Sequence, residues 1–429
     1  MINFKDKKIS TSFYYGWIIV AIGALGIFFS GPGQTYSNAI FIDYYIEDFG
    51  WSRSMVSSVY SIATLAAGLL MMVVGKYIDK YGQRFFMIFV AVMLAISCFW
   101  NSMVSNIVML FLGFFLIRLF GQGSMTLIPN TLIPQWFIVR RGRAFSFMAI
   151  GGFLSSALFP IVNLWAIEEW GWQTAWRLWG VLLLILFVPL VYLFVRNKPE
   201  DMGLLPDNKK QHDITNSGSD TLINEVSWTL AEAKKTKTFW FLLCCVGIPS
   251  MVNTGITFHL LSIFSENGLE PQLAATVLGI MAFVGFPITF LSGFILERVQ
   301  ANSILVVTFL GEIIVLALLV FSKSPFIAIL FGLLWGLFAG IERIALNVIW
   351  PNFFGREHIG SIKGLAMSIT VIGSAFGPLP FGLAFDLFNG YEEILIATMI
   401  FPIVGIGLAW KATKPKKSHG HLYEKITSA

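Results

Sequence analysis

The sequence predicts an all-α membrane protein whose twelve transmembrane helices form two six-helix bundles of the same orientation. Three observations carry this prediction. The 429 residues are 56% hydrophobic and only 12% charged, whereas a soluble protein carries roughly a quarter charged residues. The chain also contains twelve long apolar runs, and its second half repeats landmarks of the first. Because such a composition leaves too few polar residues to cover an apolar core, we expect lipid to be the solvent.

Each apolar run is long enough to cross a bilayer, whose core about 30 Å thick needs about 20 helical residues. The expected spans are 15–37, 55–74, 85–103, 107–129, 144–167, 178–195, 239–264, 273–295, 304–321, 326–349, 364–388 and 394–410. Lysines precede the first span and no small-residue cleavage site follows it, so we expect this helix to be retained and not removed as a signal peptide.

The longest polar stretch falls between the sixth and seventh spans. The expected organisation is a cytoplasmic tail (1–13), a first bundle (14–196), a cytoplasmic linker (197–237), a second bundle (238–411) and a second cytoplasmic tail (412–429). Within the linker, Leu222, Val226 and Leu230 recur every four residues. That spacing predicts a short amphipathic helix on the inner membrane surface.

The positive charges indicate the orientation. If both termini are cytoplasmic, almost all Lys and Arg residues fall in cytoplasmic segments, as the positive-inside rule expects. The exceptions are Arg53, Arg177 and Lys323 in outer loops and Arg118 and Arg343 within spans. The net charge of +5 is therefore a topology signal with some attraction to anionic lipid heads. We expect the lipid bilayer, and no nucleic acid, as a partner.

An internal repeat relates the two halves. With an offset of 218, the first-half residues Gly50, Gly75 and Asp79 recur as Gly268, Gly293 and Glu297; with an offset of 217, Gly123, Asn130 and Pro134 recur as Gly340, Asn347 and Pro351. Six spans per half place both copies in the membrane the same way up. This parallel repeat is typical of a two-lobed transporter with a substrate path between the lobes.

One loop carries a family resemblance. The string Gly75-Lys-Tyr-Ile-Asp79-Lys-Tyr-Gly82-Gln-Arg84 follows the second span and resembles the cytoplasmic-loop signature of the major facilitator superfamily. The resemblance implies that the lobes rock about a central site and that Gly75, Asp79, Gly82 and Arg84 form a conformational latch. In it, Asp79 interacts with a neighbouring helix start and with loop arginines, and helix N-termini do attract carboxylates.

Three further strings are similar to the monocarboxylate porter and oxalate/formate antiporter branch. They are Phe49-Gly-Trp51-Ser-Arg53-Ser, the segment 136–144 and the segment 198–207. This resemblance implies small carboxylates as cargo and protons or a second anion as the coupling partner. The chain departs from the branch in span eight, where Phe286 precedes Pro287 in place of an Arg, and Ala282 replaces the acidic residue one turn earlier.

Charged side chains within the spans are candidates for function, because a charge at mid-bilayer costs roughly 2.5–3.5 kcal/mol. Glu342 and Arg343 are adjacent and therefore lie about 100° apart around a helix, so each needs its own partner. We expect Arg343 to bind an anionic group of the cargo and Glu342 to carry a proton. The alternative is that both belong to ion pairs between the lobes.

Two other intramembrane charges carry separate expectations. Arg118 resembles the fourth-helix Arg motif of the superfamily, which implies proton coupling or a place in the cavity wall; the alternative is a structural hydrogen-bond hub. Glu312 lies in the ninth span, which is peripheral in this fold. We expect a hydrogen-bonded carboxylic acid there rather than a cargo site.

Helix breaks point to a midplane site. Gly31-Pro32-Gly33 interrupts the first span, and Pro249 falls at the corresponding place in the seventh. Paired breaks in the two halves indicate a binding site at the repeat interface. The candidate cargo contacts beside them are Gln34, Tyr36, Asn38, Asn253, Thr254 and Thr257, with helix–helix hydrogen bonding as the alternative. His259 is a candidate for proton coupling, or else a hydrogen-bonded core residue.

The sequence disfavours an enzyme. It shows no convergent metal-ligand set, no Gly-x-Ser-x-Gly elbow and no phosphate-binding Lys loop, so we expect no cofactor and no metal. The expected function is secondary active, proton-coupled transport of a small organic anion, a mono- or dicarboxylate, by a monomeric unit in a bacterial plasma membrane. The alternatives are an exporter or exchanger of a neutral or amphipathic compound, and a receptor with a transporter fold.

Overall fold

The computed structural model describes residues 13–208 and 226–417, and within them the regular structure is entirely helical. The first half contains α1 (Gly16–Phe28), η1 (Gly31–Gly33), α2 (Thr35–Phe49), α3 (Arg53–Tyr81), α4 (Gln83–Asn101), α5 (Ile107–Ile117), η2 (Arg118–Ser124), α6 (Met125–Trp136), α7 (Arg141–Leu182), η3 (Leu183–Phe187) and α8 (Val188–Phe194), followed by the 3₁₀ turns η4 (Pro199–Met202) and η5 (Pro206–Asn208). The second half contains α10 (Leu230–Ala233), α11 (Lys237–Glu266), α12 (Pro271–Ile295), α13 (Ala301–Val320), α14 (Pro325–Phe354), α15 (Ile359–Phe376), α16 (Pro378–Phe388), α17 (Glu392–Thr398) and α18 (Ile400–Lys411).

The described helices give twelve membrane crossings. Eleven helical segments are long and apolar enough to span a bilayer, and the longest, Arg141–Phe194, has 54 residues. An unbroken helix of that length would extend about 80 Å at 1.5 Å per residue. It is divided at Gly171, whose φ of 79° and ψ of 157° are non-helical, so this segment crosses twice. The expected all-helical fold of twelve spans is confirmed.

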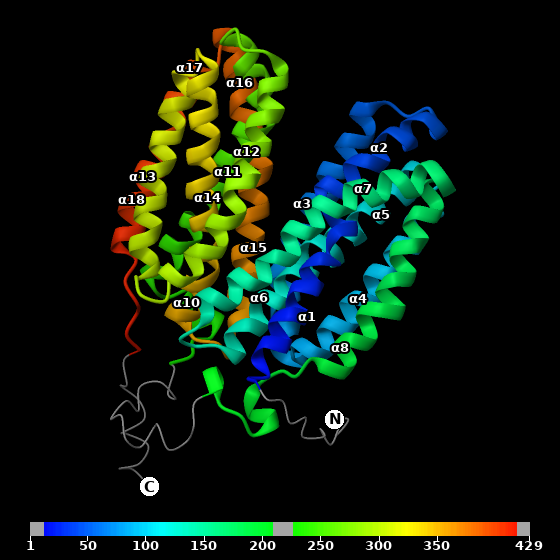
Figure 1. The fold of residues 1–429 in the computed structure, drawn as a ribbon, viewed down its shortest axis with the longest axis vertical. Helices are drawn as coiled ribbons and strands as arrows, with labels where there is room; N and C mark the ends of the chain where they lie inside the picture. The colour runs from blue at the N-terminus through cyan, green and yellow to red at the C-terminus, as the bar shows by residue number, and fades with distance from the viewer. Residues whose placement is uncertain (1–12, 209–225, 418–429) are drawn as a thin grey trace.

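The helices form two bundles that meet at one end (Figure 1). α1–α8 make the first bundle and α11–α18 the second, and α1 begins and α18 ends toward the end where the bundles meet. We call this end the termini side and the opposite end the far side. Toward the far side the two bundles diverge.

Aromatic stacking and buried hydrogen bonds hold the interior of the first bundle. Phe159 stacks on Trp179 with ring centres 3.9 Å apart. Trp179 Nε1 donates to Asn163 Oδ1 over 2.6 Å, and Asn163 Nδ2 donates to Ser37 Oγ over 2.8 Å. Because lipid tails are as apolar as Leu side chains, such packing and interhelical hydrogen bonds carry helix association in a membrane.

The two expected helix breaks differ. In the first span, η1 separates α1 from α2, and Gly33 lies so close to the neighbouring span that an added Cβ would be 2.2 Å from the Ile117 carbonyl oxygen. In the seventh span, α11 continues through Pro249 without a break, so the prediction of a matching interruption there is wrong. A single proline removes one helical hydrogen bond, and packing against neighbouring helices is enough to keep the helix intact.

The end of the linker also differs from the prediction. Leu222 lies outside the described residues, and Val226 stands in irregular backbone, so the expected amphipathic helix is not formed at Val226; helix begins only at Leu230. Trp228 donates its backbone N–H to the Phe354 carbonyl at the end of α14. This hydrogen bond joins the end of the linker to the second bundle.

An ion pair fixes this linker end to the C-terminal segment. Lys417 Nζ lies 3.0 Å from the Glu232 carboxylate. The Thr229 backbone N–H and the Lys417 ammonium lower the pKa of Glu232 to about 2. Its carboxylate is therefore ionised at neutral pH and completes the N-terminal capping box of α10.

Candidate functional site: a closed end and a two-cation cavity

The bundles touch through glycines on the termini side. A Cβ on Gly75 of α3 would lie 2.1 Å from the Gly360 carbonyl oxygen of α15, and one on Gly142 of α7 would lie 2.2 Å from the Gly293 oxygen of α12. No side chain fits at such distances. Glycine at these positions is what lets the helices of opposite bundles approach backbone to backbone.

Asp79 joins the end of α3 to the start of α15. Its Oδ1 accepts from the Gly360 backbone N–H over 2.8 Å, and its Oδ2 accepts from the Ser361 N–H over 2.7 Å and the Ser361 hydroxyl over 2.5 Å. These N–H groups belong to the first turn of a helix, where no intrahelical acceptor is available and the dipole favours a negative charge.

Glu297 makes the corresponding contact in the other half. Its carboxylate accepts from two nitrogens of the Arg143 guanidinium at the start of α7: Nε lies 2.7 Å from both carboxylate oxygens, and Nη2 lies 2.5 Å from Oε2. Asp79 and Glu297 are separated by 218 positions, and so are their partners Arg143 and Ser361. The closed end is therefore built twice, once for each copy of the repeat.

The other predicted latch residues act within the first bundle. Gly82 adopts a positive φ of 82° between α3 and α4, a conformation that favours glycine. Arg84 donates to the Tyr192 carbonyl over 2.7 Å, and its backbone N–H donates to Asn197 over 2.8 Å. The structure thus brings Gly75 and Asp79 to the bundle interface, while Gly82 and Arg84 shape the α3–α4 turn beside α8.

Two termini-side residues that the sequence analysis did not single out also fasten this end. The Asp207 carboxylate accepts backbone N–H groups of residues 138–140 over 2.8–3.1 Å. Arg356 donates to the Gln135 carbonyl over 2.6 Å and pairs with Glu200 over 2.5 Å. Asp207 belongs to the segment 198–207, which was considered only for its similarity to the monocarboxylate branch. The positive φ of 58° at Asp207 cannot be predicted from the spacing of residues in the sequence.

A cavity of about 220 Å³ lies between the bundles just inside the closed end. Residues of α6, α11, α14 and α15 line it: Thr126, Leu127, Asn130, Val246, Arg343, Leu346, Asn347, Trp350, Lys363, Ala366, Met367 and Thr370. Two of these side chains, Arg343 and Lys363, are cationic, and none of these lining residues is acidic. We call this space the two-cation cavity. The size is suited to a small molecule.

Lys363 is buried in the wall of this cavity. Its Nζ donates to the Asn130 carbonyl and to Asn347 Oδ1, both over 3.2 Å, and it lies 4.7 Å from the centre of the Phe145 ring. The expected span began at residue 364 and left Lys363 in a cytoplasmic loop. α15 in fact begins at Ile359, which moves the ammonium one turn into the helix.

Arg343 faces the same cavity and is exposed within it. Its guanidinium carbon lies 5.4 Å from the centre of the Phe153 ring of α7. Among the described residues its side chain has no hydrogen-bond acceptor. A guanidinium with unused donors beside an aromatic face is suited to a planar anionic group.

The polar residues near the first-span break bond within their own bundle. Arg118 donates to the Gly33 carbonyl over 2.9 Å and to Thr35 Oγ1 over 3.2 Å. Gln34 donates to Ser30, Tyr36 to Ser155, and Asn38 to the carbonyls of Pro32 and Gln34. These contacts have the form of helix–helix hydrogen bonding, and these residues are not among those lining the two-cation cavity.

The candidate cargo and proton residues of the second half point to different surroundings. Asn253 accepts from Trp335 Nε1 over 2.7 Å, Thr254 bonds to Ser374 over 2.9 Å, and Thr257 is exposed. His259 lies between the Tyr391 hydroxyl at 3.2 Å and the Pro378 carbonyl at 3.1 Å. Both ring nitrogens are thereby used, which matches the alternative of a hydrogen-bonded core histidine.

Glu342 points away from its neighbour Arg343. It lines a separate small pocket together with Glu312, behind the two-cation cavity. The expectation that Glu312 is hydrogen-bonded is wrong, since both of its carboxyl oxygens are buried without a partner among the described residues. Its spacing in the sequence could not indicate that α14 brings a second carboxyl group to it.

Comparison with known proteins identifies the fold. Residues 23–378 match the sequence model of the Major Facilitator Superfamily. The chain belongs to the Major Facilitator Superfamily. This membership makes it a multi-pass membrane transporter of small molecules and not an enzyme, as the sequence predicted.

Individual superfamily members resemble this chain at low identity. A glycerol-3-phosphate transporter of Bacillus subtilis is 23% identical, covering 91% of this chain and 92% of its own. A gallate transporter of Pseudomonas putida is 21% identical, covering 97% and 94%. The solved structure of the proton:xylose symporter XylE superposes with a TM-score of 0.70 at 15% identity, over 94% of this chain and 97% of that one.

Proposed function

We propose that this facilitator is a secondary active transporter of a small organic anion. The single observation that carries the proposal is the cavity between the bundles, whose lining holds Arg343 and Lys363 and no acidic residue. Cargo bound there contacts both bundles, because Thr126 and Asn130 come from α6 and the other lining residues from α11, α14 and α15. A site shared by both lobes is what alternating access requires.

Electrostatics favours an anion over a neutral compound. Lys363 is 5% exposed and has no carboxylate among its hydrogen-bond partners, which occupy two of its three N–H donors. A buried ammonium without a counter-ion is unfavourable. A carboxylate or phosphate placed between Lys363 and Arg343 offsets that cost and accepts hydrogen bonds from both.

Arg343 offers a substitute for the missing span-eight arginine of the monocarboxylate branch. Phe286, which stands at that arginine's position before Pro287, packs against Phe153 with ring centres 4.6 Å apart. Phe153 is also the ring beside the Arg343 guanidinium. We infer that α14 supplies the cation that α12 supplies in the branch.

Two of the relatives support an anionic cargo, since a glycerol-3-phosphate transporter and a gallate transporter are named for small organic anions. Other similar proteins, such as the xylose symporter XylE, are named for neutral sugars. Monocarboxylate or dicarboxylate cargo remains our first choice for this chain, with proton coupling. We assign the termini side to the cytoplasm of a bacterial plasma membrane, so that the closed end faces inward and the structure is outward-facing.

Anion binding by purified protein tests the proposal. Monocarboxylates, dicarboxylates, gallate, glycerol-3-phosphate and neutral sugars are screened by thermal shift, and Kd is then measured for the compounds that stabilise. Arg343→Gln and Lys363→Gln each remove a charge-assisted hydrogen bond, worth about 1.5–3 kcal/mol, so Kd should rise about 10- to 100-fold. Lys323→Gln, on an exposed outer-loop lysine, is the matched control and should leave Kd unchanged. Stabilisation by neutral sugars alone, or equal affinity in all variants, would contradict the proposal.

A further inference from the structure

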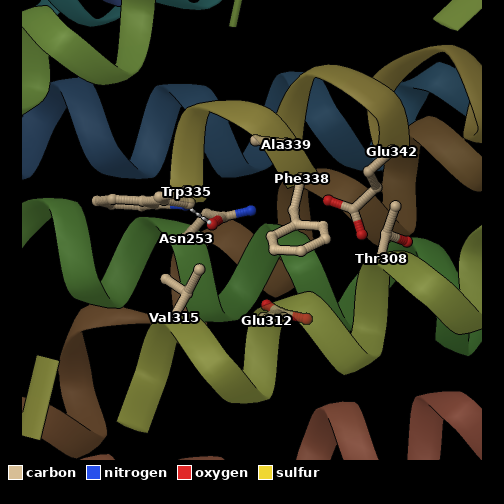
Figure 2. A pocket seen from close by; sticks show the side chains of 8 residues that line it. All are labelled: Asn253, Thr308, Glu312, Val315, Trp335, Phe338, Ala339 and Glu342. Carbon is tan, nitrogen blue, oxygen red and sulfur yellow. Dashed lines mark hydrogen bonds between the residues drawn. The ribbon is translucent and has the colours of Figure 1, made fainter. Parts of the chain in front are cut away.

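A second polar pocket lies inside the second bundle, apart from the two-cation cavity. It is lined by Asn253 of α11, by Thr308, Glu312 and Val315 of α13, and by Trp335, Phe338, Ala339 and Glu342 of α14. Its volume is about 10 Å³, which is room for one water molecule and none for an organic solute. Figure 2 shows the carboxyl groups of Glu312 and Glu342 entering this space from different helices.

Both carboxyl groups lack partners. The two oxygens of Glu312 are buried with no hydrogen bond among the described residues. Glu342 is 9% exposed, and the described residues provide no hydrogen-bond or ion-pair partner for it either. Phe338 covers the pocket, and its ring lies against Gly311, where an added Cβ would be 2.3 Å from a ring carbon.

No other titratable group of the described residues forms an ion pair with either carboxyl group. The Cys245 thiol of α11 and Arg343 of α14 act on Glu342 only through their electrostatic fields, and the Arg343 side chain faces the two-cation cavity. Helix α12, which packs against α14, carries no titratable side chain. Several other charged groups of the second bundle are engaged elsewhere: His259 and Glu266 contact Tyr391, and Lys363 lines the cargo cavity. Lys411 ends α18, and Glu392 and Glu393 are exposed at the start of α17.

Two ionised carboxylates are not stable in such a place. Each would be desolvated without a hydrogen-bond donor or an ion-pair partner among the described residues, and each would repel the other in a medium of low dielectric constant. Protonating one carboxyl group removes the repulsion. A water molecule in the pocket would then find partners in the carboxyl oxygens, in the Thr308 hydroxyl and in the Asn253 amide, whose oxygen accepts from Trp335 (Figure 2).

We propose that Glu312 and Glu342 form a proton-binding site, separate from the cargo cavity and linked to it through α14. A proton from the solvent forms an O–H bond with a carboxylate oxygen of the pair and leaves again as that bond breaks to water. No electron transfer or co-reactant is involved.

Adjacency on α14 couples this site to cargo. The positive charge of Arg343, one residue from Glu342, favours the ionised carboxylate while the cargo cavity is empty. An anion bound to Arg343 cancels that field, so anion and proton bind more tightly together than either does alone. This coupling rests on the proposed function; the proton site itself does not.

Infrared spectroscopy of the purified protein tests the proton site without any cargo. At neutral pH the wild-type protein should show a carboxylic-acid C=O absorption that Glu312→Gln and Glu342→Gln each remove or shift. Glu393→Gln, on an exposed residue, should leave it unchanged. Gln keeps the size of the side chain, and two independent variants protect the test against one that fails to fold.

A second measurement tests the coupling. At a pH where the carboxylic-acid absorption of the cargo-free protein is half its maximum, addition of a binding anion to weakly buffered wild-type protein should increase that absorption and take up a fraction of a proton per molecule, read with a pH indicator, and both Gln variants should lose this uptake while binding the anion. Unchanged infrared absorption in both variants would overturn the proton site. So would stabilisation by Na⁺ over K⁺ that Glu312→Gln abolishes, which would assign a metal cation instead. If no anion binds at all, the proposed function fails while the infrared result still decides the proton site.

Discussion

Single carboxylates hold the closed end of this facilitator, and they do so in two chemical ways. Asp79 accepts backbone N–H groups at a helix start, whereas Glu297 accepts a guanidinium fork. Backbone donors are fixed in space, while an arginine side chain follows its partner when the helices move. Asp79 is therefore the more direction-dependent contact of the two.

Asp79→Asn should bias the molecule away from the closed end. Asparagine keeps one acceptor and turns an NH₂ group toward the N–H donors of residues 360 and 361, which costs about 1–3 kcal/mol. We expect the rate of anion exchange across the proteoliposome membrane to fall several-fold, while the Kd for the anion changes less than about threefold. Asp386→Asn, on an exposed side chain, is the control; a large change in Kd without a change in exchange rate would contradict this role.

At the residue scale the sequence indicates which side chains are chemically unusual better than it indicates where they point. It indicated that the adjacent Glu342 and Arg343 cannot pair with each other, and the two side chains do line different pockets. It could not show that Lys363 is helical and faces the cargo cavity, since one turn at a helix start decides this. Nor could it show that Gln34, Tyr36 and Asn38 bond inside their own bundle, because a polar side chain has the same spacing whether it meets cargo or a neighbouring helix.

Helix elements differ in how their irregularities are held. The break between α1 and α2 is supported from outside, since Gly33 lies against the π-helical segment η2 and its carbonyl accepts from Arg118. α11 carries Pro249 without comparable support and stays continuous. A Gly-Pro-Gly string therefore predicts a break better than an isolated proline does, because two glycines also remove side-chain constraints on the backbone.

Gly33→Ala should destabilise the first bundle. The new Cβ would lie 2.2 Å from the Ile117 oxygen and 2.5 Å from the Gln122 nitrogen, and both are backbone atoms that cannot rotate away. Overpacking of this kind costs about 1–3 kcal/mol, so the thermal midpoint of the purified variant should fall. Gly407→Ala, where nothing lies within 4 Å, is the control. A midpoint equal to that of the control would show that the two spans separate easily.

At the scale of the whole molecule, duplication explains the shape. The contacts Asp79–Ser361 and Glu297–Arg143 are equivalent under the repeat offset, as are the glycine approaches of α3 to α15 and of α7 to α12. All of them lie on the termini side. Opening this end therefore requires both sets to separate together, which favours two discrete states over a continuous range.

The global architecture was the most predictable level. Hydropathy gives the spans because every backbone group in lipid must be bonded within a helix, and the offset of 218 gives the parallel arrangement. The sequence could not indicate which end is closed, because that depends on the balance between two interface surfaces. It also could not place Glu312 beside Glu342, since that requires the packing of α13 on α14.

Distances between spin labels on the two bundles test the account most directly. Labels are placed at Tyr81 and Val299 for the termini side and at Ser105 and Lys323 for the far side, with the exposed Cys244 replaced and the buried Cys98 and Cys245 kept. We predict that binding of the organic anion under a proton gradient changes the two distances in opposite directions, with the termini side widening as the far side narrows. Distances that stay constant, or that both widen or both narrow, would contradict two bundles pivoting about a shared anion site.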